Sequence, residues 1–207
     1  MIRKVGIINY GAGNLMSISK AIDVLGYQPL IINSSPIKNC DVLILPGVGN
    51  FGSAMKMLNS TGLDEEIKKF FSLGKPILGI CLGIQLVFNS SEEAKDVKGL
   101  SLVSGKVVKF STRGLPVPHI CWNIVRFKNK NTALLAGLRD EEYFYFVHSY
   151  YPLVSEKNIV FATTCYGVKF CSMIVKNNLV ATQFHLEKSG DKGLKLLSNI
   201  MKYFELL

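Results

Sequence analysis

Hydrophobic and polar residues follow one pattern in the first half of the chain and another in the second. Up to about residue 90, short apolar runs alternate with segments whose apolar residues recur every three or four positions. The short runs predict strands buried on both faces, because polar residues do not alternate along them. These strands are expected at Lys4–Asn9, Gln28–Asn33, Asp41–Leu45 and Pro76–Ile80.

Helical periodicity separates these strands. After the turn Tyr10-Gly11-Ala12-Gly13, Asn14 is expected to cap a first helix that Gly26 ends. Its apolar face consists of Leu15, Ile18, Ile22 and Leu25. Further helical patterns cover Met55–Leu58, Leu63–Phe71 and Leu82–Phe88. Buried strands that alternate with helices indicate an open, mostly parallel sheet with helices on both faces.

From about Leu100 the chain runs in short strands punctuated by turn residues such as Asn129. Strands are expected at Leu102–Phe110, Ile124–Phe127, Tyr143–His148, Ile159–Thr164, Phe170–Lys176 and Leu179–Phe184. A helix over Gly193–Phe204 ends the pattern. Closely spaced strands without helices between them favour antiparallel pairing. We therefore predict one α/β domain over residues 1–207, with an antiparallel extension of the sheet in the C-terminal half.

The composition allows a sizeable core, since 48% of the 207 residues are hydrophobic. The apolar start of the chain is too short, and too polar at its flanks, for a signal peptide. No apolar run approaches the roughly 18 residues of a membrane span. These features predict a soluble, cytoplasmic protein without a membrane partner.

The formal net charge of +9 comes mainly from lysines spread over the whole chain. A nucleic-acid site would gather basic residues on one face with aromatic residues between them, and no such cluster is visible. Nucleic acid is therefore not expected as a partner. A solvated lysine-rich surface is the simpler interpretation, and a basic rim that attracts anionic substrates or an acidic partner is the second.

The five cysteines include no Cys-x-x-Cys pair, which favours free thiols in a reducing compartment. His119 with Cys121, Cys165 and Cys171 fits no closed zinc pattern, so no metal site is expected.

Cys81 is the candidate nucleophile. It stands between the strand that ends at Ile80 and the helix that begins at Leu82, with Gly79 and Gly83 on either side. This is the logic of the G-x-S-x-G elbow with cysteine in place of serine. The start of the helix favours a thiolate, and the Leu82 N–H is placed to donate to an oxyanion. A buried structural cysteine at a tight turn explains Cys81 alone equally well.

A nucleophilic cysteine needs a base, and the chain has three histidines, His119, His148 and His185. His185 ends a predicted strand, and Glu187 follows two residues later. Residues i and i+2 of extended chain point the same way, so Glu187 can hold the imidazole in its working tautomer. We therefore select His185 as the base and Glu187 as its orienting partner.

Together these residues resemble the class I, or triad, glutamine amidotransferases. Gly79–Gln85 is similar to their nucleophile motif, and Phe184–Glu187 is similar to their His-x-Glu motif, in the same order. The resemblance narrows to the glutaminase subunits of imidazole glycerol phosphate synthases. The segments that carry it are Ile8–Leu15, Pro46–Gly52, Pro118–Asn123, Tyr145–Tyr150 and Glu187–Ser189.

The resemblance implies a flavodoxin-like sheet and the hydrolysis of L-glutamine to glutamate and ammonia, without a metal or organic cofactor. The implied catalytic triad is Cys81, His185 and Glu187. The implied oxyanion hole consists of Leu82 and the backbone of Gly47, Val48 and Gly49. The residues implied to hold the amino-acid end of glutamine are Gln85, Glu93, His148, Ser149 and Tyr150.

The implied partner is a (β/α)8-barrel cyclase subunit, bound as a heterodimer, which receives the ammonia in histidine biosynthesis. The residues implied to face it are Tyr10, Gly11, Asn14, Trp122, Asn123 and Lys188. Each assignment has a plainer interpretation, since the glycine-rich loop can be a simple turn and the aromatic residues near His148 can be sheet core.

Three positions depart from the resemblance. Asn9 stands where aspartate is frequent, Cys121 where glycine is usual and Leu186 where proline is common. None of them is a reacting group. Two alternatives therefore remain: the same glutaminase serving another synthase, such as a nucleotide-sugar amidination system, or a non-catalytic scaffold that retains the fold.

Overall fold

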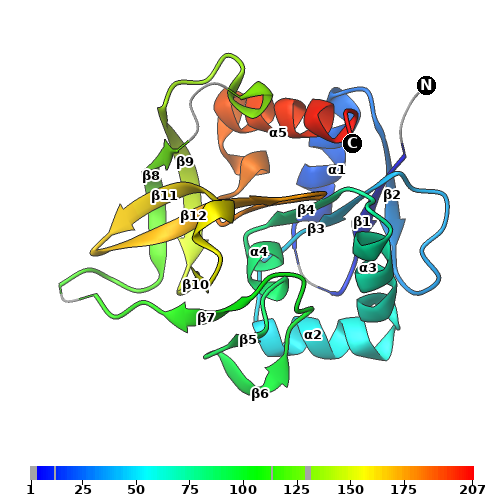
Figure 1. The fold of residues 1–207 in the computed structure, drawn as a ribbon, viewed down its shortest axis with the longest axis horizontal. Coiled ribbons are helices and arrows are strands. Elements are labelled where there is room, and N and C mark those ends of the chain that lie inside the picture. Colours follow the sequence, from blue (N-terminus) through cyan, green and yellow to red (C-terminus); the bar gives the residue numbers. More distant parts are fainter. Residues whose placement is uncertain (1–3, 12, 113, 129–131) are drawn as a thin grey trace.

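The computed structural model describes residues 4–11, 13–112, 114–128 and 132–207 (Figure 1). Ala12 of the predicted turn and the predicted turn residue Asn129 lie outside these ranges. Among the described residues, the strands form one sheet of nine and a smaller sheet of four.

Half of the large sheet is parallel. Its strands pair in the order β2-β1-β3-β4-β13, each parallel to its neighbour. They are β1 (Lys4–Ile8), β2 (Gln28–Ile32), β3 (Val42–Leu45), β4 (Ile77–Ile80) and β13 (Leu179–Thr182). The last strand in the sequence thus joins the parallel half beside β4, the strand that precedes Cys81.

The other half of the sheet continues from β13 in antiparallel order β12-β11-β8-β9. These strands are β12 (Val168–Lys176), β11 (Val160–Tyr166), β8 (His119–Phe127) and β9 (Glu141–His148). The predicted α/β sheet with an antiparallel C-terminal extension is confirmed, and this extension is as large as the parallel half. β8 begins at His119, earlier than the Ile124 expected from the sequence.

The second sheet was not predicted as a separate sheet, although one of its strands lies within the predicted strand Leu102–Phe110. It has the order β10-β7-β5-β6 and consists of β5 (Ser90–Ser91), β6 (Ala94–Lys98), β7 (Gly105–Lys109) and β10 (Tyr150–Val154). β5 has two serines, β6 has two lysines and an aspartate, and β10 contains Pro152. The residues of β5 and β6 have low strand propensity, and Pro152 interrupts the strand pattern of β10, so pairing with neighbours in the folded chain defines these strands.

Five helices are formed by the described residues: α1 (Leu15–Val24), α2 (Phe51–Ser60), α3 (Leu63–Ser72), α4 (Leu82–Leu86) and α5 (Gly190–Phe204). Single 3-10 turns, η1 (Ala133–Leu135), η2 (Lys157–Ile159) and η3 (Leu186–Lys188), connect later elements. The predicted cap is confirmed, because the Asn14 side chain accepts a hydrogen bond from the Ser17 N–H. None of the helices in the described ranges is both long and apolar enough to cross a membrane.

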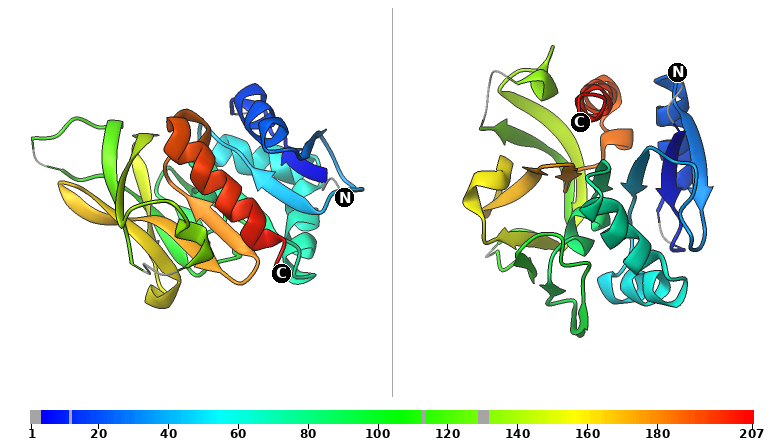
Figure 2. Two further views of the ribbon diagram at one scale, coloured as in Figure 1. Left: turned by 90° about the horizontal axis from the view of Figure 1, so that it is seen from above. Right: turned by 45° about the vertical axis from the view of Figure 1, so that its right-hand side comes forward.

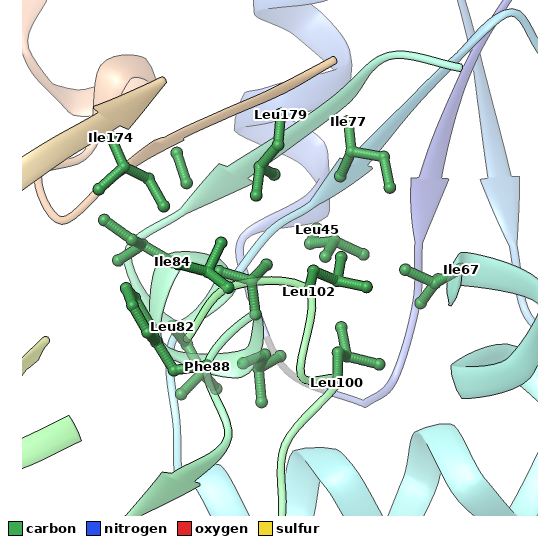
Figure 3. Close-up of a cluster of buried hydrophobic side chains, with 14 of the residues drawn as sticks. Leu45, Ile67, Ile77, Leu82, Ile84, Phe88, Leu100, Leu102, Ile174 and Leu179 are labelled. Carbon is green, nitrogen blue, oxygen red and sulfur yellow. The ribbon is translucent and has the colours of Figure 1, made fainter. Parts of the chain in front are cut away.

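The parallel strands bury alternate side chains in two cores. Ile77 of β4 belongs to the cluster under α2, α3 and α4, whereas Leu78 and Ile80 belong to the cluster under α1 and α5. The two views in Figure 2 show these helix groups on opposite faces of the sheet. Figure 3 shows part of the first cluster, in which Leu45 and Leu82 lie at the carboxyl ends of the parallel strands. The candidate site is at this edge, where open α/β sheets place their ligands.

Candidate active site

Cys81 occupies a strained turn between β4 and α4. Its φ of 54° and ψ of −100° lie outside the regions that non-glycine residues favour. The Cys81 N–H donates to the Thr182 carbonyl oxygen at 2.7 Å, which ties the turn to β13. Such strain persists only where neighbouring structure enforces it, and here it projects the thiol beyond the sheet edge.

The glycines beside Cys81 are required for close packing. A Cβ atom at Gly83 would lie 2.0 Å from the Leu45 carbonyl oxygen, and one at Gly79 would lie 2.9 Å from the Gly83 carbonyl carbon. α4 therefore rests directly on the ends of β3 and β4. From the sequence, these glycines were expected to permit a tight backbone turn, but the positive φ belongs to Cys81 itself.

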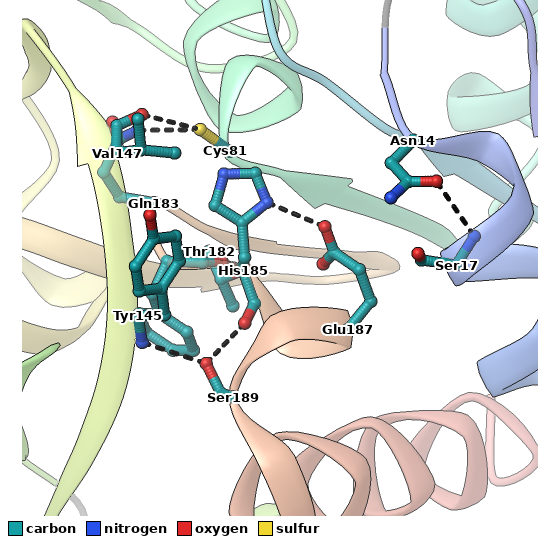
Figure 4. Close-up of polar contacts among 11 residues, drawn as sticks. Asn14, Ser17, Cys81, Tyr145, Val147, Thr182, Gln183, His185, Glu187 and Ser189 are labelled. Atoms are coloured by element: carbon teal, nitrogen blue, oxygen red, sulfur yellow. Dashed lines mark hydrogen bonds and ion pairs between the residues drawn. The ribbon is translucent and has the colours of Figure 1, made fainter. Parts of the chain in front are cut away.

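His185 and Glu187 lie beside Cys81 in the order that the sequence predicted. Figure 4 shows the imidazole between the Cys81 sulfur and the Glu187 carboxylate. His185 Nδ1 and Glu187 Oε1 are 2.7 Å apart, and the two side chains are 1% and 4% exposed. His185 Nε2 is buried without a hydrogen-bond partner among the described residues. The nitrogen on the side away from Glu187 is therefore free to exchange a proton with sulfur or substrate.

Backbone contacts fix the position of the imidazole. The His185 N–H donates to the Tyr145 carbonyl oxygen at 3.0 Å. Ser189 donates its hydroxyl to the His185 carbonyl oxygen and accepts from the Tyr145 N–H (Figure 4). Tyr145 of β9 and Ser189, which follows η3, thus hold the backbone of His185.

The charges around His185 favour its protonated form. Burial lowers the pKa of the imidazole, but the negative charges of Cys81 and Glu187, with the hydrogen bond to Glu187, outweigh burial and raise the pKa above its ordinary value. His185 is therefore suited to carry a positive charge beside Cys81.

A cavity of about 210 Å³ opens in front of Cys81. All five residues predicted to hold glutamine line it, namely Gln85, Glu93, His148, Ser149 and Tyr150. Gln85 donates its amide to the Tyr150 carbonyl oxygen at 3.1 Å. Glu93 accepts from the Phe51 N–H at 2.7 Å, so its carboxylate also caps the start of α2.

The predicted oxyanion hole is occupied by the protein itself. The Leu82 N–H donates to the Gly47 carbonyl oxygen at 3.3 Å. Val48 and Gly49 line the cavity, and Gly49 has a φ of +122° that favours glycine. Leu82 and the glycine-rich loop are therefore adjacent as predicted, but the donor on Leu82 is not available to a substrate in this conformation.

Gln183 is a site residue that was not predicted from the sequence. Its side chain is fully buried, and its Nε2 atom donates to the Cys81 sulfur at 3.8 Å. The same sulfur lies 3.7 Å from the Val147 carbonyl oxygen (Figure 4). Gln183 and His185 are also two residues apart, as His185 and Glu187 are. This spacing could have predicted that the Gln183 side chain points toward the site.

A chain of hydrogen bonds runs from the cavity into the antiparallel half of the sheet. His148 Nδ1 lies 2.8 Å from the Tyr150 carbonyl oxygen, which can only accept, so Nδ1 carries the proton. His148 Nε2 then accepts from His119 Nδ1 at 2.9 Å, and His119 Nε2 accepts from the Asn123 amide at 3.2 Å. Both imidazoles are neutral in this series of hydrogen bonds. His119 supports His148 at the cavity, and it was not among the predicted site residues.

The hydrogen bonds between His119 and His148 predict how the stability of the protein depends on pH. Burial lowers the pKa of His119 to about 4 and that of His148 to about 3, whereas the pKa of His185 is raised. None of the three imidazoles should therefore change charge between pH 5 and 7. In the unfolded chain all three titrate near pH 6.5, so stability falls as pH drops below that value, by about 1.4 kcal/mol per pH unit for each imidazole held neutral.

His185 adds nothing to this slope, because below pH 6.5 it is protonated in both states. Imidazole nitrogen shifts recorded by NMR from pH 5 to 7 and urea unfolding over the same range provide the measurements. If the imidazole of His119 or His148 titrates near pH 6.5 in the folded protein, the two side chains are not held neutral.

The residues predicted to face a partner divide into two groups. Gly11, Asn14, Trp122 and Lys188 are exposed. Tyr10 is 3% exposed and packs in the core, so its expected position at a partner surface is wrong in this conformation. Asn123 is likewise turned inward, since its amide bonds His119 and the Cys165 carbonyl oxygen. Neighbouring residues on a strand face opposite ways, so Trp122 and Asn123 lie on opposite faces of β8, and Asn123 is partly buried.

Two of the departing positions have a structural explanation. The Asn9 side chain accepts from the Gly11 N–H and donates to Asn33, so it stabilises the turn after β1. Leu186 is 1% exposed and fills the core under α1 and α5.

Comparison with known proteins gives consistent matches. The family described as "Glutamine amidotransferase class-I" matches residues 7–203. Imidazole glycerol phosphate synthase subunit HisH of Caldanaerobacter subterraneus is 45% identical, covering 98% of this chain and all of that protein. The subunit of the same name from Methanocaldococcus jannaschii is 48% identical over 96% of this chain and 98% of its own length.

Solved structures share the fold. "Structure of PurLQS from Thermotoga maritima" superposes with a TM-score of 0.77 at 18% identity and covers 98% of this chain and 99% of the matched chain. A glutamine amidotransferase from Thermotoga maritima gives a TM-score of 0.69 at 17% identity, covering 100% of this chain and 84% of the matched chain. At such identities the likeness concerns the fold alone.

Proposed function

This chain belongs to the class-I glutamine amidotransferase family, and from that premise we propose that it is the glutaminase subunit of an imidazole glycerol phosphate synthase. The observation that carries the proposal is the buried arrangement of Cys81, His185 and Glu187, with Cys81 lining a cavity of about 210 Å³. The relatives called imidazole glycerol phosphate synthase subunit HisH match this chain over nearly its whole length.

The first half of the reaction forms a thioester. The Cys81 thiolate adds to the side-chain amide carbon of glutamine, and the amide oxygen gains negative charge. His185, held by Glu187, gives the proton on Nε2 to the departing nitrogen, which leaves as ammonia. The cavity residues Gln85 and Glu93 hold the amino-acid end of the substrate.

The second half regenerates the enzyme. His185 Nε2 takes a proton from water, which attacks the thioester carbonyl carbon. The carbon–sulfur bond breaks, glutamate leaves and the thiolate is restored.

The oxyanion needs donors that the observed loop does not supply. The Leu82 N–H must release the Gly47 carbonyl oxygen, and a loop N–H must turn toward Cys81. A rotation of the Gly47–Val48 peptide achieves both changes. Removal of one such donor typically costs about 100- to 1,000-fold in rate, so opening of this loop is a strong control point. We propose that partner binding drives it.

The partner surface is proposed on the outer face of β8 and β9. Ile120, Trp122 and Tyr143 are large apolar residues that are each more than half exposed, and they come from these two paired strands. Exposed aromatic residues of this kind anchor protein interfaces. We assign the partner as a (β/α)8-barrel cyclase, which receives ammonia without its loss as ammonium to solvent.

The test is nitrogen transfer. The purified chain is mixed with the cyclase subunit of the same organism, the cyclase substrate and glutamine labelled with ¹⁵N in its side-chain amide. We expect the label in the imidazole product and unlabelled glutamate in equal amount. If glutamate forms but the imidazole product carries no label, the chain serves another synthase. If no glutamate forms, the chain is a non-catalytic scaffold.

Trp122→Ala tests the proposed surface in the same assay. Loss of a central aromatic anchor should weaken cyclase binding by about 30-fold or more, as an interface hot spot does. Leu73→Ala is the matched control, since Leu73 is an exposed apolar residue after α3. Isothermal titration of both variants against the cyclase provides the measurement, and equal affinities would remove Trp122 from the interface.

A further inference from the structure

Tyr10 carries a buried hydroxyl that has no use in the observed conformation. Its side chain belongs to the core cluster that contains Leu45 and Leu82. The hydroxyl is shielded from solvent and has no hydrogen-bond partner among the described residues. A phenylalanine would fill the same space without burying an unpaired donor. The hydroxyl therefore calls for a role in another state of the protein.

The neighbour of this hydroxyl is Gly47. A Cβ atom built on Gly47 would lie 2.6 Å from the Tyr10 hydroxyl oxygen and 2.4 Å from Leu82 Cβ. Tyr10 and Leu82 thus both pack against Gly47, whose carbonyl oxygen accepts the hydrogen bond from the Leu82 N–H. Any larger residue at position 47 would be blocked by these two side chains.

The hydroxyl remains a donor throughout the pH range of the reaction. Burial raises the pKa of Tyr10 far above its ordinary value, and the nearby charge of Cys81 raises it further. The phenol is therefore neutral, and its proton is available to an acceptor.

Opening of the oxyanion hole creates such an acceptor. When the Leu82 N–H is released for the substrate, the Gly47 carbonyl oxygen loses its donor in a buried place, which is costly unless another donor replaces it. We propose that Tyr10 is a positioning residue of the oxyanion loop, whose hydroxyl donates to the Gly47 carbonyl oxygen in the open state. One hydrogen bond then replaces another, and the open state gains the partner that the closed state lacks.

This inference rests on the proposed glutaminase function and adds a residue to it. The test compares the wild type with Tyr10→Phe, both in complex with the cyclase subunit. We expect kcat for glutamine hydrolysis to fall about fivefold to tenfold, the effect of one lost hydrogen bond. KM should stay unchanged, because Tyr10 does not line the glutamine cavity.

Two readouts separate positioning from a structural role. The urea midpoint of Tyr10→Phe should equal or exceed that of the wild type, since the closed state loses only an unpaired group. Alkylation of Cys81 by iodoacetamide should keep its rate, because direct displacement forms no oxyanion. Tyr203→Phe is the control, as it also removes one hydroxyl, which in Tyr203 of α5 donates to the Asn177 carbonyl oxygen, and it should keep full kcat.

The outcomes distinguish the two levels of the proposal. An active wild type with an equally active Tyr10→Phe variant overturns the role of Tyr10 and leaves the glutaminase function standing. The same holds if Tyr10→Phe loses stability in step with kcat, which would mark the hydroxyl as structural. A wild-type complex that does not hydrolyse glutamine overturns the proposed function itself, and this inference with it.

Discussion

Replacement of Cys81 with alanine abolishes glutamine hydrolysis, with an expected loss of at least about 10⁴-fold in kcat, because no other group in the cavity can form the thioester. The fold should be retained, since alanine meets the same backbone strain as cysteine at this φ. Ammonia release in the cyclase complex is the measurement. Product formation from added ammonium salt should persist, because that nitrogen bypasses Cys81.

Cys165→Ala is the matched control, since Cys165 is an exposed free cysteine outside the site. It should keep full activity and should leave covalent labelling by a glutamine-mimicking electrophile unchanged. Labelling should be confined to the peptide that contains Cys81. Residual hydrolysis in Cys81→Ala at more than about a hundredth of the wild-type rate is incompatible with a covalent mechanism at this residue.

Changes at His185 and Glu187 should have the next largest effects. His185→Asn removes the group that moves the proton, and we expect a loss of about 10³- to 10⁴-fold in kcat. Glu187→Gln keeps the shape but removes the charge that orients the imidazole and raises its pKa. A loss of about 10²- to 10⁴-fold is expected, because the imidazole can then take the wrong tautomer.

The pH dependence of iodoacetamide alkylation at Cys81 is the measurement for Glu187→Gln. Removal of the Glu187 charge lowers the pKa of His185, so the thiolate–imidazolium pair loses its cation at a lower pH than in the wild type. Glu205→Gln serves as the control, since Glu205 lies at the end of α5 and accepts from the Tyr27 hydroxyl, away from the site. An unchanged alkylation profile in Glu187→Gln would remove Glu187 from the charge pair.

The nucleophile's elbow could be predicted because its signal is local. Cys81 stands at the point where an apolar run gives way to helical periodicity, and the strand-to-helix turn follows from those two patterns. His185 and Glu187 were accessible for the same reason, since their spacing on extended chain sets their relative direction. That β4 and β13 are neighbours, which brings the two motifs together, is a property of the sheet order.

Gln183 follows the same spacing rule as Glu187 but was not predicted. It stands two residues before His185 and contacts the Cys81 sulfur, so the available periodicity pointed to it. The small sheet is a different case. β5, β6 and β10 have weak strand patterns, and they are strands only because β7 and one another supply their pairing partners.

Other features depended on packing between distant segments. Trp122 and Asn123 looked equivalent as partner-facing residues, yet β8 presents one outward and turns the other toward His119. Tyr10 lay in a segment expected at the surface, and the close approach of β1 and the loop after β3 buries it beside Gly47. Periodicity assigns a residue to a face of its own strand, and only neighbouring elements decide whether that face meets solvent.

By itself, therefore, the sequence determined the class of fold, the elbow at Cys81 and the His185–Glu187 pair, because each depends on residues close together along the chain. The tertiary structure alone decided that the Leu82 donor is occupied by Gly47, that His119 and His148 share a neutral hydrogen-bond chain and that the Tyr10 hydroxyl is buried with no partner among the described residues. Hydrogen bonds between segments far apart in sequence depend on distances that no local pattern encodes.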